Sequence, residues 1–296
     1  MPCLIPKLQE IVMSGSSQCF CETFVYEPAN FDEENLGSLY LVGQFDGDEA
    51  NSGSLLNLLA SVIKREFYAS FKRKTLCAFE AALKKANLTL ADFIESNNID
   101  WTGKIHLVCA AINKKMLYLT QIGKAQACLW RNQELVNVCN NLASLQKNPY
   151  PLKAFGSLVS GGLMPADRFV LTTPNLMSVF SKNSLKKMLG LSNLAEASQN
   201  IQQEIQKNKP QTSLAALLIE MQLPKKDQSD NVEWGKLTPS VCHPIDFSEI
   251  VQETQIRSKA TIVPEITTVS AVQNFLHRPK VLGQHYFQKL RKIIRR

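Results

Sequence analysis

Residues 104–138 read KIHLVCAAINKKMLYLTQIGKAQACLWRNQELVNV, and this stretch decides the fold. It divides into four short segments rich in Val, Ile, Leu, Tyr or Trp, and each break between them carries Asn, Lys, Gly or Gln. Such apolar and aromatic residues are enriched in strands, whereas Gly and Asn favour tight turns. The stretch therefore predicts four consecutive strands, with the turn at Ile122-Gly123 at the centre of the block.

Strands and helices are predicted on both sides of this block. Alternating or continuous apolar runs predict strands at 8–13, 20–26, 39–45, 155–159, 168–172 and 214–221. Apolar residues at helical spacing predict helices at 55–67 and 75–96, and shorter helices around 176–189 and 194–207. Because strands and helices do not alternate strictly, a doubly wound parallel sheet is disfavoured. The order favours an α/β (α+β) fold with two antiparallel β-sheets sandwiched between helix pairs.

Composition and charge narrow the functional classes. The 296 residues carry 33 basic and 26 acidic side chains, a net charge of +7, and seven basic residues without an acid fall in 277–296. Residues 1–276 are therefore close to neutral, so we expect no nucleic-acid binding by the domain. The sequence contains no run of about 20 apolar residues, so no membrane-spanning helix is predicted. The eight scattered cysteines, without a CxxC motif, are interpreted as small buried residues of a cytoplasmic protein.

A possible metal site follows the strand predicted at 39–45. Asp46, Gly47, Asp48 and Glu49 stand together there, and carboxylate and carbonyl oxygens are the ligands that Mg²⁺ prefers. Asp-Gly is also ordinary turn chemistry, and acids in the first turn of a helix complement its dipole. His106 and Cys109 form no second centre, because residues three apart on a strand point to opposite faces.

Four segments resemble motifs of the PP2C-type (PPM-family) Ser/Thr protein phosphatases, in the family's order. They are 39–47 (LYLVGQFDG), 119–130 (LTQIGKAQACLW), 165–176 (PADRFVLTTPNL) and 211–219 (QTSLAALLI). The resemblance implies a PP2C-like domain over 1–222 and a two-metal phosphatase centre in which Asp46 and the Gly47 carbonyl are metal ligands. Recurring prolines and fading apolar periodicity predict a largely irregular linker at 223–276, and apolar residues at helical spacing among basic ones predict a basic amphipathic tail at 277–296.

The chain departs from the family at most of the other metal-ligand positions. Pro174-Asn175 replaces the family's Asp-Gly, Lys124 replaces the Asp after the turn glycine, and Pro210-Gln211 replaces the final Asp-Asn. The family's N-terminal Arg and acids have no match before Glu22. One carboxylate cannot hold two cations about 3.5–4 Å apart. We therefore predict no catalytic residue and no cofactor, with Asp46 and Gly47 as a vestigial metal site.

Three functions follow from these observations. The leading prediction is an inactive or weakly active phosphatase-like module that binds a protein or a phosphorylated partner. The first alternative is an active metal-dependent Ser/Thr phosphatase using Mg²⁺ or Mn²⁺, with acids recruited from Asp32, Glu33, Asp48 or Asp167. The second is a membrane-associated scaffold, because residues 283–296 alternate apolar and basic residues in a pattern suited to an anionic bilayer surface. A solvated charged terminus would have the same composition.

Overall fold

The computed structural model describes residues 4–15, 19–47, 49–97, 101–140, 142, 150–208 and 213–224. The tail and nearly all of the predicted linker lie outside the described residues. Among the helices within these ranges, none has the length and apolar content needed to span a bilayer.

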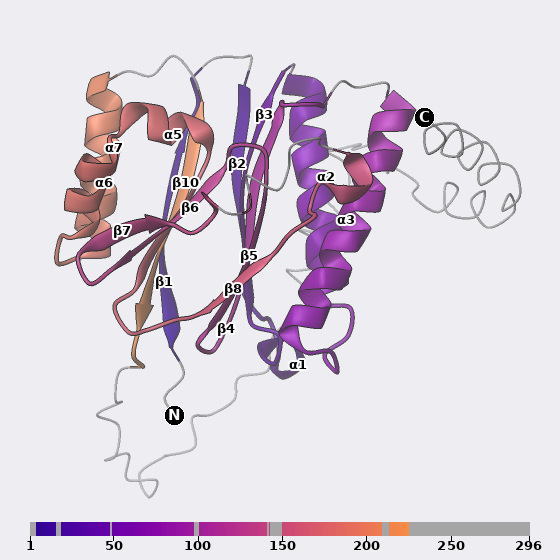
Figure 1. The fold of residues 1–296 in the computed structure, drawn as a ribbon, viewed down its shortest axis with the longest axis horizontal. Helices are drawn as coiled ribbons and strands as arrows, with labels where there is room; N and C mark the ends of the chain where they lie inside the picture. The colour runs from indigo at the N-terminus through magenta and orange to yellow at the C-terminus, as the bar shows by residue number, and fades with distance from the viewer. Residues whose placement is uncertain are drawn as a thin grey trace, which may run out of the picture. The chain divides into compact units, whose positions relative to one another are not determined.

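Two five-stranded sheets form the centre of the domain (Figure 1). The first has the order β1-β10-β9-β6-β7, with bounds Ile5–Met13, Leu214–Gln222, Arg168–Thr172, Gln126–Arg131 and Glu134–Asn137. The second has the order β2-β3-β4-β5-β8, with bounds Cys19–Tyr26, Ser38–Asp46, Ile105–Asn113, Met116–Ile122 and Val159–Gly162. Every neighbouring pair is antiparallel, which confirms the predicted fold class.

Helices cover the outer face of each sheet (Figure 1). The second sheet packs against α2 (Glu49–Phe67) and α3 (Thr75–Asn97) through a core that includes Leu41, Leu59 and Phe79. The first packs against α5 (Pro174–Val179), α6 (Lys182–Leu189) and α7 (Leu194–Asn208). Short helices α1 (Phe31–Glu34) and η1 (Pro151–Lys153) complete the described elements. A third core fills the space between the two sheets.

The strand predicted at 155–159 is wrong. Val159–Gly162 forms the edge strand β8 beside β5, whereas Phe155 packs into the core next to α3. The buried Asn87 amide holds the Phe155 backbone, accepting from its N–H at 2.8 Å and donating to its carbonyl at 3.3 Å. These two hydrogen bonds satisfy the backbone of Phe155 in place of bonds to a neighbouring strand. A side chain of α3 therefore holds this apolar segment.

Strand register decides which side chains reach the site. Tyr40 and Val42 belong to the core between the sheets, so Gln44 and Asp46 further along β3 lie on that same inner face. Gln44 stands opposite His106 of β4 in the antiparallel pairing. The space between the sheets therefore ends in polar side chains, at the start of β2 and β4 and the end of β3.

Candidate functional site

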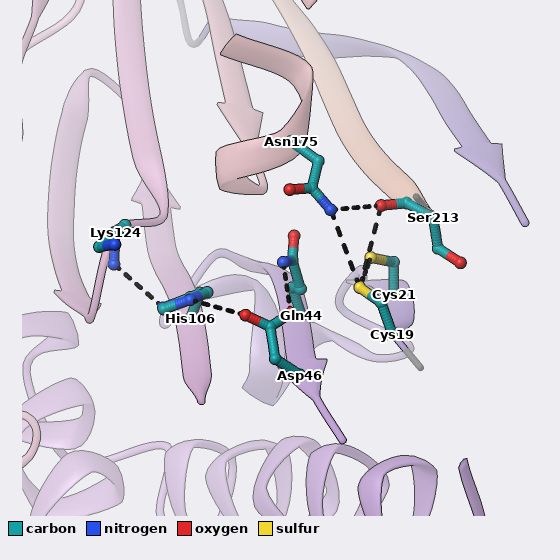
Figure 2. A network of polar contacts seen from close by, with 8 residues as sticks. All are labelled: Cys19, Cys21, Gln44, Asp46, His106, Lys124, Asn175 and Ser213. Carbon is teal, nitrogen blue, oxygen red and sulfur yellow. Dashed lines mark hydrogen bonds and ion pairs between the residues drawn. The ribbon is translucent and has the colours of Figure 1, made fainter. Parts of the chain in front are cut away.

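Asp46 has a nitrogen partner at each of its carboxylate oxygens (Figure 2). Gln44 Nε2 donates to Oδ1 at 2.7 Å, and His106 Nε2 lies 3.4 Å from Oδ2. Burial raises the pKa of Asp46, but the hydrogen bonds from His106 and Gln44 outweigh it, so the pKa lies below its ordinary value. The carboxylate is therefore ionised and engaged by donors of the protein itself.

The backbone of the β5–β6 turn orients the imidazole of His106. Lys124 N–H donates to His106 Nδ1 at 3.2 Å, so Nδ1 is an acceptor and Nε2 carries the proton that faces Asp46. Gly123 makes this approach possible, since its φ is +66° and an added Cβ would stand 2.3 Å from His106 Nδ1. The glycine of the predicted central turn thus has a specific steric role.

Two thiols lie beside Asp46 on β2. Cys19 and Cys21 share the inner face, and their sulfur atoms are 3.7 Å apart. Cys19 stands opposite Asp46 in the β2–β3 pairing, and Cys21 stands opposite Gln44. Hydrogen bonding with the Cys19 thiol, together with burial, raises the pKa of Cys21 above its ordinary range.

Asn175 of α5 and Ser213, the residue before β10, contact the thiols from the side of the first sheet (Figure 2). Asn175 Nδ2 donates to the Ser213 carbonyl at 2.8 Å and lies 3.8 Å from Cys19 Sγ. Cys19 Sγ is in turn 3.9 Å from the Ser213 carbonyl oxygen. Asn175, which stands where the family's motif has glycine, therefore joins α5, β10 and β2 at the site.

Sequence reasoning identified Asp46 but missed four of its neighbours. His106 was considered only as a partner of Cys109, and the two do point to opposite faces as predicted. Cys19 and Cys21 were interpreted as core residues; Cys21 is only partly buried, and Cys77 on α3 is exposed. Gln44 carried no signal of its own. The cross-strand register of β2, β3 and β4 would have found all four, because it places them around Asp46.

The acids proposed for an active centre do not reach Asp46 where they are described. Asp32 and Glu33 lie on α1, before the start of β3. Asp46 is the last of the nine residues of that strand, about 26 Å from its first residue at the usual rise. Asp167 is buried and binds Arg131 Nε at 2.8 Å and the Met164 N–H at 2.7 Å. Asp48 lies outside the described residues.

The donor set does not fit a pair of hard cations. In the part of the chain that the structure describes, no group of three or more His, Cys, Asp or Glu side chains could hold a metal ion. Pro174 begins α5, and the Lys124 side chain is exposed at the turn. Gly47 follows Asp46 directly, whereas Pro210-Gln211 lies outside the described residues. Two-metal hydrolysis needs several carboxylates around a bridging water, and the described residues supply Asp46 alone.

A polar cavity of about 440 Å³ lies between the β5–β6 turn and α5. Its described lining includes Lys124 and the amides of Gln121, Gln126, Asn137 and Asn140, and no acid. Another cavity, of about 520 Å³, lies where the edge strands β7 and β8 meet and is lined mainly by aliphatic side chains. The first cavity is lined by Gly123 and Lys124, the turn residues whose backbone contacts His106.

No protein-family profile matches the chain. No curated protein matches its sequence. Among solved structures it is similar to PppA, described as a key regulatory component of the T6SS in Pseudomonas aeruginosa, with 13% identity and a TM-score of 0.56 over 75% of this chain and 100% of that one.

It is similar as well to the catalytic domain of the serine/threonine phosphatase PstP in complex with two manganese ions. The identity is 16% and the TM-score 0.57, over 74% of this chain and 99% of that one. For the S. agalactiae serine/threonine phosphatase, the identity is 15% and the TM-score is 0.55, over 73% of this chain and 99% of that one. The described part of this chain therefore has the fold of the PP2C-type (PPM-family) Ser/Thr protein phosphatases.

Proposed function

We propose that this chain is a PP2C-fold binding or regulatory module that lacks two-metal phosphatase activity. The observation that carries the proposal is the isolation of Asp46: among the described residues, no group of three or more His, Cys, Asp or Glu side chains could hold a metal ion. The oxygens of Asp46 face Gln44 and His106, whereas two-metal hydrolysis needs several carboxylates around a bridging water.

The replacements around Asp46 support the same proposal. Lys124 brings an ammonium group to the turn where the family's motif has a carboxylate, and a cation disfavours the approach of further cations. Pro174 has no side-chain donor atom to offer a metal. Without a bridging metal-bound water, the fold has no activated nucleophile for a phosphoester.

We further propose that the partner is a protein or a phosphorylated protein segment. The cavity beside the site offers amides and the Lys124 ammonium, which suit carbonyl or anionic groups. Similarity to PppA, a regulatory component, favours a protein partner by analogy of fold alone.

Phosphatase assays and thermal melting test this function. The purified chain should hydrolyse p-nitrophenyl phosphate with Mn²⁺ no faster than a matched Asp46→Asn variant. On zinc-free protein, chelator should leave the melting temperature unchanged and millimolar Mn²⁺ should add little, because a ligand that binds only the native state stabilises it by RT ln(1 + [L]/Kd), which is small for a weak ligand. Mn²⁺-dependent turnover that disappears in Asp46→Asn would refute the proposal and favour the active alternative.

Restoring part of the family's motif gives a further control. Pro174→Asp with Asn175→Gly should not create activity, since the other carboxylates remain absent. The scaffold alternative depends on residues 283–296, which lie outside the described residues, and it stays a prediction tested with liposomes.

A further inference from the structure

Four side chains form a rectangle on the inner face of the second sheet. Cys19 and Cys21 are two residues apart on β2, and their cross-strand partners Asp46 and Gln44 are two residues apart on β3. Directly opposite residues in an antiparallel pair have Cβ atoms about 4.5–5.5 Å apart. The register therefore places two thiols, one carboxylate and one carboxamide side by side on this face (Figure 2).

The spacing of the two sulfur atoms suits a tetrahedral ion. Zinc–thiolate bonds are about 2.3 Å long, so two sulfurs on one tetrahedral zinc ion stand about 3.8 Å apart. Cys19 Sγ and Cys21 Sγ are 3.7 Å apart. The sulfur spacing is therefore compatible with both thiolates on one ion.

Gln44 gives a second and independent indication of a ligand. Its side chain is 2% exposed, and its Oε1 atom is buried without a hydrogen-bond partner among the described residues. Buried polar atoms almost always have a partner, so an unpartnered oxygen calls for a missing donor or ion. Figure 2 shows this oxygen pointing away from Asp46, into the space between the sheets where Asn175 and the thiols also lie.

Asp46 fixes the orientation of that amide. Gln44 Nε2 donates to Asp46 Oδ1 at 2.7 Å, so the amide nitrogen is held on the carboxylate and Oε1 is the atom left free. Outer partners that orient a ligand in this way are a regular feature of metal sites. Asp46 acts here as a positioning residue for Gln44.

We propose that Cys19, Cys21 and Gln44 Oε1 form a site for one thiophilic divalent cation of the zinc class, with water completing its coordination. Each thiol loses its proton on binding, so two protons leave as one cation enters and the two thiolates neutralise its charge. Thiolates select zinc over the harder Mn²⁺ and Mg²⁺. The proposal is independent of the proposed function, which concerns hydrolysis.

Metal titration of the reduced full-length chain tests the site. Zn²⁺ should bind with one equivalent by calorimetry, and Cd²⁺ should produce the ultraviolet charge-transfer band of a cadmium thiolate. Excess Mn²⁺ should displace neither metal. Zinc binding should be accompanied by proton release and should tighten as pH rises.

Matched variants assign the ligands. Cys19→Ser and Cys21→Ser should each weaken zinc binding at least about 100-fold, the upper end of what loss of an outer partner costs. Cys77→Ser, which removes an exposed thiol on α3, should bind as the unmodified chain does. A Cys3→Ser/Cys242→Ser variant controls for thiols outside the described residues. Asp46→Asn should bind more weakly while keeping the cadmium band.

Several outcomes would overturn the site. Zinc binding that survives Cys19→Ser, displacement of zinc by Mn²⁺, or absence of the cadmium band in the unmodified chain would each do so, and the last two need no variant. A reduced chain that binds no metal and oxidises to a Cys19–Cys21 disulfide, seen by mass spectrometry, would assign the pair to redox chemistry instead. Mn²⁺-dependent hydrolysis would refute the proposed function without testing the thiol site, which the zinc and cadmium titrations test separately.

Discussion

Gly123→Ala should destabilise the domain far more than an alanine at another glycine of the same backbone conformation. The new Cβ would stand 2.3 Å from the Ile105 carbonyl oxygen and 2.3 Å from His106 Nδ1. The first contact is with backbone, so it cannot be relieved by rotating a side chain. The second would push the imidazole away from the Lys124 N–H and from Asp46.

The magnitude has two parts. A non-glycine residue in the left-handed region costs about 1–2 kcal/mol, and Gly123 has φ +66°. Forcing extra atoms into a filled site costs about 1–3 kcal/mol more. We therefore expect the free energy of unfolding to fall by about 2–5 kcal/mol.

Gly103→Ala supplies the matched control. Gly103 has φ +74°, but an added Cβ there would meet nothing within 4 Å, so only the conformational cost of about 1–2 kcal/mol applies. Urea denaturation of both variants gives the two losses from their midpoints at equal slope. If Gly123→Ala were no more destabilising than Gly103→Ala, the tight packing of the turn on His106 would be refuted.

Three further predictions concern the core, pH and the tail. Asn87→Ala should lower the free energy of unfolding by about 2–4 kcal/mol, because the buried N–H and carbonyl of Phe155 lose their partner; a loss under about 0.5 kcal/mol in urea denaturation would contradict this. The lowered pKa of Asp46 stabilises the fold above the unfolded value of about 3.9 and is lost as pH falls through the folded value. The difference in melting temperature between the unmodified chain and Asp46→Asn should therefore be constant at neutral pH and shrink in acid, and a difference unchanged well below that value would count against the contact. Anionic liposomes should bind the full chain at low salt, with each basic residue near the surface contributing about 1 kcal/mol; equal binding after deletion of 283–296 would exclude the membrane role.

The parts of the fold that sequence predicted well are those with local signals. The turns of the block at 104–138 stand next to the strands they join, and Arg168–Thr172 is bounded as predicted. β8 could not be found in this way. Two of its residues are Gly161 and Gly162, which give no strand signal, and it exists because it pairs with β5, about forty residues away. Pairing between distant segments leaves no trace in local periodicity.

In the site, too, local motifs predicted one residue, whereas strand pairing placed its neighbours. Asp46 was predicted from its motif, whereas Cys19 and His106 reach it through the register of β2 and β4 on β3. A shift of one residue in either pairing would move those side chains to the helix-covered face. No property of a single strand fixes that register, so the sequence could name the carboxylate without naming what surrounds it.

The neighbours of Asp46 supply a physical argument for metal-independent folding. An ionised carboxylate at the end of two sheets needs compensation for the water it loses, and a pair of divalent cations would provide it. Here two N–H donors, from Gln44 and His106, provide hydrogen bonds instead. The Lys124 N–H holds the other nitrogen of His106 as an acceptor and so fixes the neutral tautomer whose Nε2 proton faces Asp46. Removing Mg²⁺ or Mn²⁺ therefore leaves no uncompensated charge at Asp46, so a chelator should not change the melting temperature of zinc-free protein. Zinc bound at the thiols would itself stabilise the native state, and its removal is a separate measurement.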